Sequence, residues 1–301
     1  MAACERAQLS WGETAITEIV MSRAAAAVSV VPFSQQAEAI SGADWVWWWV
    51  DATSAYGMLV QAKRLRVDRG RWRFDFGYRN RAGSQWARLR ETAATMDLVP
   101  VYALYLGTGD YRSWAPCPDD HQGLRCHSCV KRSVSLMPAL LADSWIVNDS
   151  KTTYERSVAL EDIATPSWTA SFLIPALREQ LAPDLANFLL TTQTGTRAVT
   201  RSMIDRVLRV RMGQFGAVSA PGLTAARDSS HDRLGPVFSE LPTDTGHWNE
   251  PYFGHVLNPL RHVPPGYVLE IESGEFDVDE LASNMPEDVT GIVVVRLPQN
   301  G

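Results

Sequence analysis

The chain has 301 residues, of which 46% are hydrophobic and 21% charged, ordinary values for a globular protein. These values exclude a disordered chain and a collagen-like repeat, and four cysteines are too few for a disulfide-built scaffold. The formal net charge of −6 argues against a protein that coats nucleic acid by bulk charge alone. No stretch approaches the roughly 18 apolar residues that span a bilayer, and the first residues lack the pattern of a secretory signal. We therefore expect a cytoplasmic protein with no membrane partner.

The first third of the chain predicts a regular succession of helices and strands. Ser10 and Glu13 have the spacing of a capping box, which marks the start of a helix. Runs of β-branched and aromatic residues indicate strands, and a change to helical composition follows them. The expected elements are a helix at 10–23, strands at 28–33, 44–51 and 58–65, a helix at 83–96 and a strand at 99–106.

The remaining two thirds predict further helices and strands with weaker patterns. The expected elements are a loop at 114–131, mostly helical segments at 133–142 and 168–190, a helix at 197–212, loops at 217–252, and strands at 268–271 and 290–297. The fold class that follows is mixed α/β (α+β). We expect a core at 1–112, a Cys/His loop at 113–132, and a C-terminal α+β extension at 133–301 that packs on the core or continues it.

A carboxylate, an amide and an ammonium group fall close together on the predicted hairpin of the second and third strands. Folding this hairpin about a midpoint near Ser54 places Asp44 opposite residues 63–65, beside Gln61 and Lys63, provided that their faces match. Their neighbours are aromatic and aliphatic. Polar groups are costly in such surroundings unless they are paired or bind a metal. The hairpin therefore predicts a functional site.

Metal-dependent phosphodiester cleavage is one chemistry that needs these residue types. Mg²⁺ prefers hard oxygen ligands, one or two of them carboxylates. Asp44 supplies a carboxylate, Gln61 a neutral carbonyl oxygen, and Glu13 on the preceding helix a second negative charge. Lys63 would hold the attacking water or stabilise charge on the phosphoryl group. We expect Mg²⁺ or Mn²⁺ as the cofactor, with Asp44, Gln61, Lys63 and Glu13 as the catalytic set.

Three short motifs carry a resemblance to a known family. They are Gly12-Glu13 with Thr17, Glu38 followed by Gly42-Ala43-Asp44-Trp45-Val46-Trp47, and Gln61-Ala62-Lys63-Arg64-Leu65. With these motifs the sequence resembles the PD-(D/E)xK, or restriction-endonuclease-like, nuclease superfamily. More narrowly, it is similar to an uncharacterised bacterial branch with GADWxW and QAK motifs. The resemblance covers about residues 11–107.

The resemblance implies an α-β-β-β-α-β core and a Mg²⁺-dependent endonuclease, with DNA favoured over RNA. Asp44 would be the metal-binding aspartate, Lys63 the catalytic lysine and Glu13 the acid of the first helix. Gln61 stands where the family has Asp or Glu, which removes one negative charge from the metal site, although other branches with Q-x-K are nucleases. Bacterial defence against phage or foreign DNA is the implied setting, and cleavage of a duplex favours a homodimer or higher homo-oligomer. The rival interpretation is a catalytically inactive nuclease-fold protein that binds nucleic acid or regulates a partner.

Several of these residues also have a purely structural interpretation. Glu13 serves equally well as the reciprocal residue of the capping box. Glu38 is either solvated, or it supports the metal ligands from behind, or it is an alternative ligand. Gln85 is either a surface residue at a helix start or a contact to the substrate backbone. The four tryptophans at 45 and 47–49 fill the core of a sheet that is covered on both faces, unless one of them stacks on a base.

The charges are unevenly distributed along the chain. Residues 63–73 hold six basic residues and one acid, directly after the proposed catalytic strand. Such a segment suits phosphate contacts without sequence recognition. Residues 270–288, in contrast, hold eight acids and no Lys or Arg, which we interpret as a solvated surface. The expected nucleic-acid-binding residues are Arg64, Arg66, Arg69, Arg71, Arg73 and Gln85.

The cysteines allow two interpretations. Cys117, Cys126 and Cys129, with His121 between them, supply enough ligands for a Cys₃His zinc site. The spacing is atypical, because it contains one CxxC pair only. Reduced, partly buried thiols are therefore favoured over a structural Zn²⁺.

Overall fold

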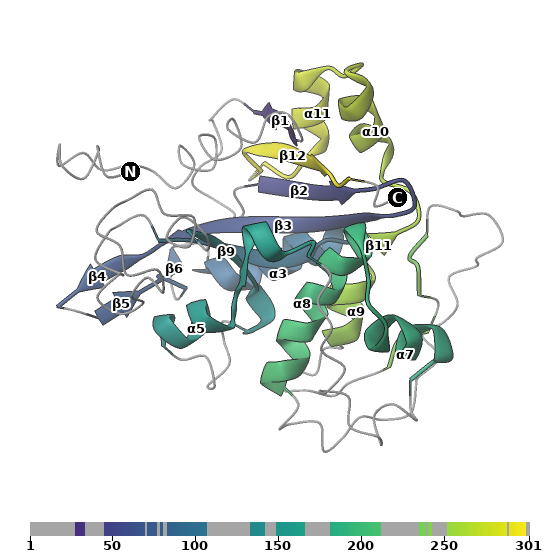
Figure 1. The fold of residues 1–301 in the computed structure, drawn as a ribbon. Coiled ribbons are helices and arrows are strands. Elements are labelled where there is room, and N and C mark those ends of the chain that lie inside the picture. The colour runs from purple at the N-terminus through teal and green to yellow at the C-terminus, as the bar shows by residue number, and fades with distance from the viewer. Residues whose placement is uncertain are drawn as a thin grey trace, which may run out of the picture.

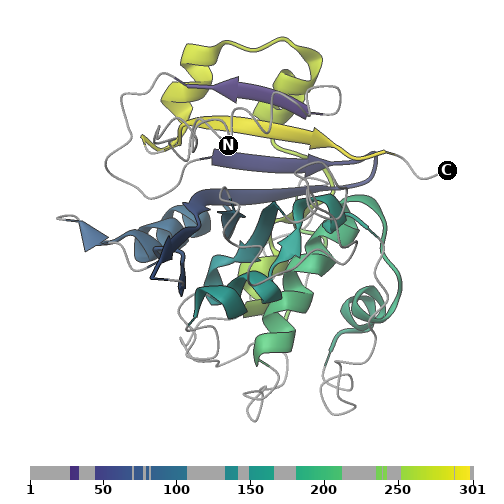
Figure 2. The same cartoon turned by 60° about the vertical axis from the view of Figure 1, so that its left-hand side comes forward.

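The computed structural model describes the fold as a mixed β-sheet with helices on both faces (Figures 1 and 2). The described residues are 28–33, 45–69, 71–76, 79–80, 83–106, 133–141, 149–165, 181–211, 235–238, 240–242, 252–287 and 289–298. This arrangement confirms the mixed α/β fold class. Within the described residues, no helix is both long enough and apolar enough to cross a bilayer.

The main sheet has the strand order β1-β12-β2-β3-β8-β9-β10, with β11 pairing beside β3. Its strands are β1 (Val28–Pro32), β2 (Trp45–Val50), β3 (Ala55–Arg64), β8 (Val99–Tyr105), β9 (Val134–Pro138), β10 (Val158–Ala159), β11 (Leu260–Arg261) and β12 (Gly291–Arg296). Two small ribbons lie outside it and consist of β4 (Arg66–Asp68) with β5 (Arg71–Arg73) and β6 (Arg79–Asn80) with β7 (Gly83–Ser84).

The helices are α3 (Gln85–Thr95), α5 (Ser150–Arg156), α7 (Pro183–Leu190), α8 (Gly195–Arg211), α9 (Tyr252–Leu257), α10 (Gly266–Ser273) and α11 (Val278–Asn284), with short 3₁₀ turns η2 (Ala139–Leu141) and η4 (Leu160–Asp162). Two of these helices follow an aspartate that caps their N-terminus. The side chain of Asp149 accepts hydrogen bonds from the first turn of α5, and Asp277 does the same for α11.

The succession β2, β3, α3, β8 agrees with the order expected from the sequence. β2 and β3 form an antiparallel hairpin, and α3 connects β3 to β8, which runs parallel to β3. The last strand, β12, lies between β1 and β2 and is parallel to β2. The strand near the C-terminus is therefore part of the same sheet as the first strands of the chain. The C-terminal segments thus continue the core.

The two faces of the sheet are covered by different helices. Directly opposed residues share a face, so Val46 and Leu59 lie on one face while Trp47 and Met58 lie on the other. α3 packs on the first face, where a Cβ added to Gly57 would collide with Leu98, which follows that helix. α8 packs on the second face. The residues of β3 and β8 themselves are thus almost all buried.

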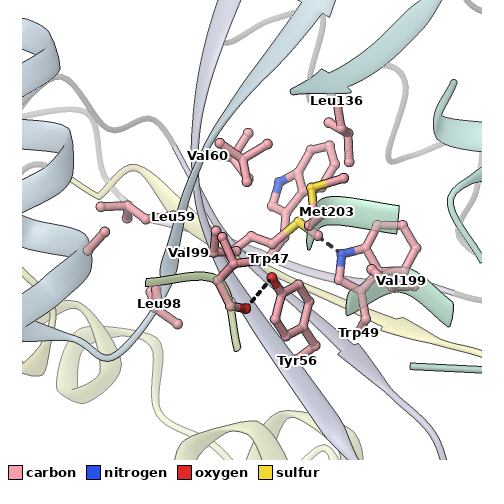
Figure 3. Close-up of a cluster of buried hydrophobic side chains, with 14 of the residues drawn as sticks. Trp47, Trp49, Tyr56, Leu59, Val60, Leu98, Val99, Leu136, Val199 and Met203 are labelled. Atoms are coloured by element: carbon pink, nitrogen blue, oxygen red, sulfur yellow. Dashed lines mark hydrogen bonds between the residues drawn. The ribbon is translucent and has the colours of Figure 1, made fainter. Parts of the chain in front are cut away.

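The tryptophan run of β2 belongs to the core. Trp45, Trp47, Trp48 and Trp49 are all buried, which confirms the core-filling interpretation over base stacking. Figure 3 shows Trp47 and Trp49 beside Val199 and Met203 of α8. The rings of Trp47 and Trp49 meet edge to face at 6.5 Å. On the opposite face, the Trp48 indole N–H donates to the hydroxyl of Tyr267 at 2.8 Å.

The predicted hairpin register is wrong by three residues. Trp45 is paired with Val60, whereas folding about Ser54 would pair it with residue 63. The reason is the loop, which has four residues because β3 begins at Ala55 rather than at Met58. A hydrogen bond from Asp51 N to Ser54 O closes it at 3.0 Å. Val46 shares a face with Leu59 and hence with Gln61 and Lys63, whereas Asp44, to which the prediction applied, lies outside the described residues.

Two further element predictions are wrong. Residues 133–142 contain strand β9 and turn η2 instead of a helix, because Pro138 interrupts the segment and β9 pairs with β8 and β10. Residues 268–271 lie in helix α10 instead of a strand. Gly274, at φ 78°, ends this helix in the left-handed conformation. Both are short apolar runs, in which strand and helix are hard to distinguish from sequence.

Asp51 joins the hairpin loop to the start of α8. Its carboxylate accepts hydrogen bonds from Thr53 N at 2.8 Å and from Thr196 N at 2.7 Å. Gly195 precedes Thr196 at φ +58°, and a Cβ there would collide with this carboxylate. Burial by itself would raise the pKa of Asp51, but the hydrogen bonds from Thr196 and Thr53 outweigh it and lower this pKa below the ordinary 3.8.

We expect Asp51→Ala to lower the free energy of unfolding by about 1–2 kcal/mol at neutral pH, the usual cost of losing a capping carboxylate. Because the folded-state pKa of Asp51 is depressed, its contribution is complete above the unfolded pKa of about 4 and is lost as the pH falls through the lower folded value. Urea denaturation of both proteins between about pH 7 and pH 3 measures this. A difference that stays constant or widens towards acid pH would contradict the assignment.

Candidate functional site

Gln61 and Lys63 lie near the carboxyl end of β3 on the face that α3 covers. They are two residues apart on one strand, so their side chains point to the same side. On the neighbouring parallel strand, Tyr102 is paired with Gln61 and Leu104 with Lys63. Two polar groups are thus enclosed between the sheet and a helix.

The Lys63 ammonium is buried and held by α3. The residue is 5% exposed, and its Nζ donates a hydrogen bond to Oε1 of Gln85 at 2.7 Å. Nζ also lies 5.7 Å from the centroid of the Tyr102 ring. Gln85 is the first residue of α3, so the position of the helix start fixes the position of the ammonium. The structure thus shows Gln85 half-buried and bound to the lysine, a contact that neither interpretation of Gln85 included, and a contact of Gln85 to the substrate backbone stays a prediction.

The side-chain amide of Gln61 is buried without a hydrogen-bond partner in the part of the chain that the structure describes. The residue is 1% exposed, and neither its Oε1 nor its Nε2 has a partner among the described residues. A buried polar group in this state costs about 1–3 kcal/mol. Such groups are rare in folded proteins and call for an explanation, of which a bound ligand or ion is one.

Aromatic rings border this site. The rings of Tyr102 and Phe76 lie 4.9 Å apart, and those of Phe76 and Phe74 lie 5.9 Å apart. The backbone N–H of Phe74 donates to Oγ of Ser150 at 2.8 Å, which ties the segment after β5 to α5. Apolar rings around an ammonium reduce the screening of its charge, so Lys63 would act strongly on an anionic group placed beside it.

The carboxylates of the predicted site lie outside the described residues. Asp44, Glu13 and Glu38 belong to segments for which the structure gives no description. The same holds for the proposed zinc ligands Cys117, His121, Cys126 and Cys129. Within the part of the chain that is described, no three His, Cys, Asp or Glu side chains are grouped so that they could hold a metal ion.

The arginines of the basic segment lie on and beside the ribbon of β4 and β5. Arg64, at the end of β3, is half-buried, whereas the others that were expected to bind nucleic acid are exposed. These are Arg66, Arg69, Arg71 and Arg73. The acids of 270–288 that the structure describes lie mostly exposed on and around α10 and α11, at the opposite end of the molecule from the ribbon (Figure 1).

Sequence reasoning did not identify Tyr102 and Phe76 as part of the site. Tyr102 lies beside Gln61 because β8 is parallel to β3 in a particular register, which no local pattern specifies. Phe76 follows the ribbon at a position with no strand or helix pattern. The signal that was available is the first tyrosine of the VYALY segment, Tyr102, which becomes informative only after the register of β8 is known.

The fold and the site together define a mixed α/β protein with a buried Gln–Lys pair at the end of a central strand. The chain belongs to DUF6615, a family of unknown function, whose family model matches residues 1–230. No curated protein and no solved structure matches the chain. The matched range includes β2, β3, α3 and β8, and therefore every described residue of the site.

Proposed function

We propose that the protein is a metal-dependent nuclease that hydrolyses phosphodiester bonds, with DNA favoured over RNA. The observation that carries this proposal is the Gln61 amide, which is buried without a partner among the described residues, on the same strand face as the anchored Lys63. A hard cation next to the Gln61 oxygen would satisfy that oxygen, and a phosphoryl group beside the Lys63 ammonium would gain from its charge.

The donor set of these residues fits a hard divalent cation. Gln61 Oε1 would be a neutral ligand, and Asp44 and Glu13 would supply the negative charges. Mg²⁺ or Mn²⁺, when bound, polarises a phosphoryl oxygen and lowers the pKa of water. Lys63 would hold the attacking water or stabilise charge on the phosphate, and Gln85 would keep its ammonium in place.

The β2–β3 register supports a position for Asp44 close to Gln61. Asp44 precedes Trp45, so their Cα atoms are about 3.8 Å apart across the peptide bond. Since Trp45 is paired with Val60, continuing the ladder by one residue would pair position 44 with Gln61. We expect this carboxylate and the Gln61 amide oxygen to be the first two ligands of the metal.

The broader setting follows from the resemblance to the PD-(D/E)xK superfamily. It implies bacterial defence against phage or other foreign DNA in the cytoplasm, and a homodimer if both strands of a duplex are cut. The rival function is that of a catalytically inactive protein of this fold that binds nucleic acid or regulates a partner. A Gln in place of the usual acid is the feature on which that rival rests.

The experiment that separates the two uses end-labelled DNA and RNA with purified full-length protein. We expect cleavage in Mg²⁺ or Mn²⁺, no cleavage in EDTA, and a higher rate on DNA. Cleavage that persists in EDTA would contradict the metal-dependent mechanism. Binding of either substrate without cleavage in any of these metals would support the inactive rival.

A further inference from the structure

We propose that the β4–β5 ribbon is a docking element for double-stranded nucleic acid, which it enters through the major groove. This inference rests on the proposed function for the kind of partner. The binding it describes needs no metal and no cleavage, so it can be tested separately.

The ribbon presents like charges directly opposite each other. Arg66 of β4 is paired with Arg73 of β5, and both side chains are exposed. Arg71 lies two residues before Arg73, so it projects to the same side, and it is exposed as well. Its register partner is Asp68, so this face has three arginine positions and one aspartate position and is positive overall. Like charges directly opposite on a ribbon destabilise it. Phosphate groups between these arginines would relieve the repulsion, so the face is complementary to a polyanion.

The opposite face of the ribbon is anchored to the body of the protein. Trp72 lies between Arg71 and Arg73 and therefore points to the other side. Its ring meets the ring of Tyr154, on α5, edge to face at 5.3 Å. The arginine face is thus held in a fixed direction.

The ribbon is also close to the candidate site. β3 continues into β4 with Leu65 alone between them, and Leu65 is buried and bonded through its N–H to Tyr105 O at 2.8 Å. Arg66 is three residues from Lys63, so their Cα atoms are at most about 11 Å apart. The ribbon therefore begins next to the strand that carries Gln61 and Lys63.

A duplex is favoured over a single strand by the chemistry of the exposed face. Proteins that bind single strands stack bases on exposed aromatic rings. The tryptophan of this ribbon is turned inward onto Tyr154, and the outward face carries guanidinium groups. A two-stranded ribbon fits the major groove, which is about 12 Å wide, and arginines there reach both phosphates and guanine edges.

The test measures fluorescence anisotropy of a labelled duplex, and of one of its strands alone, in EDTA at several salt concentrations. We expect the wild type to bind the duplex more tightly than the single strand. Arg66→Gln/Arg73→Gln should weaken duplex binding by at least about tenfold at low salt and reduce the slope of log affinity against log salt by about 1.8, the loss of two phosphate contacts.

The matched control is Arg88→Gln/Arg197→Gln, which removes the same net charge from α3 and α8, and which should bind within about twofold of the wild type. Equal losses in both double variants, no loss in the ribbon variant, or tighter binding of the single strand would overturn the proposal. Duplex binding through the ribbon by a protein that never cleaves would instead contradict the nuclease function and leave the docking element standing.

Discussion

Replacing Gln61 by leucine is expected to stabilise the protein in EDTA and to abolish cleavage. The amide of Gln61 has no partner among the described residues, so leucine of similar size removes an unpaired buried dipole and adds apolar contacts. We expect the free energy of unfolding to rise by about 1–2 kcal/mol, as measured by urea denaturation. The same change removes a metal ligand, and the cleavage rate should fall by at least about 100-fold.

Opposite effects on stability and activity are typical of a functional residue that the fold tolerates at a cost. The control is Ser135→Ala, since the Ser135 hydroxyl is also buried without a partner among the described residues. That variant should show no more than a small change in stability and wild-type cleavage. If Gln61→Leu cleaves at the wild-type rate, Gln61 is not a ligand. If it unfolds more easily than the wild type, the amide has a structural partner.

Truncating Trp47 to alanine is expected to cause the largest loss of stability. Its side chain is fully buried where β2 meets α8, in the same cluster as Trp49 and Met203 (Figure 3). Removing a large aromatic side chain from such a position costs about 3–5 kcal/mol, because the cavity closes only in part. Guanidinium denaturation measures the loss, and Trp47→Phe should recover part of it.

The comparison for this variant is Trp72→Ala, on the β4–β5 ribbon. Trp72 is half-buried and its described ring contact is with Tyr154, so its removal should cost clearly less. A larger loss at Trp72 than at Trp47 would show that the stability of the chain depends on the ribbon more than on the sheet. It would also contradict the assignment of the tryptophan run to the core.

The central elements could be predicted from sequence because their patterns are strong. β2 is an uninterrupted run of Trp and Val, and β8 is the mostly apolar run VPVYALY, which ends shortly before Gly107. Strands of this kind are buried on both faces, and no helix pattern competes with them. The segment 133–142 was different, since its short apolar run fits a strand or a helix, and pairing with β8 decided the outcome.

Of the candidate site, the sequence could predict only what the two-residue period of a strand determines. Gln61 and Lys63 share a face because they are two residues apart, and this follows from sequence alone. The contact of Lys63 with Gln85 depends on how α3 packs on the sheet. The register depended on hydrogen bonds from the backbone of Thr53 and Ser54 to the Asp51 side chain, which shorten the loop. The first of these is a tertiary contact that no local pattern encodes, whereas the second is a local turn at Asp51 of the kind that Asp and Ser favour.

The most direct test of the nuclease proposal is the rate of DNA cleavage in Mg²⁺ by the wild type and by Lys63→Ala, measured side by side. Lys151→Ala, which removes a lysine with a 43% exposed side chain, is the control for loss of a positive charge. We predict that the wild type and the Lys151 variant cleave at similar rates and that Lys63→Ala is slower by at least about 100-fold. Equal rates for Lys63→Ala and the wild type would contradict the assignment of this buried site as the catalytic centre.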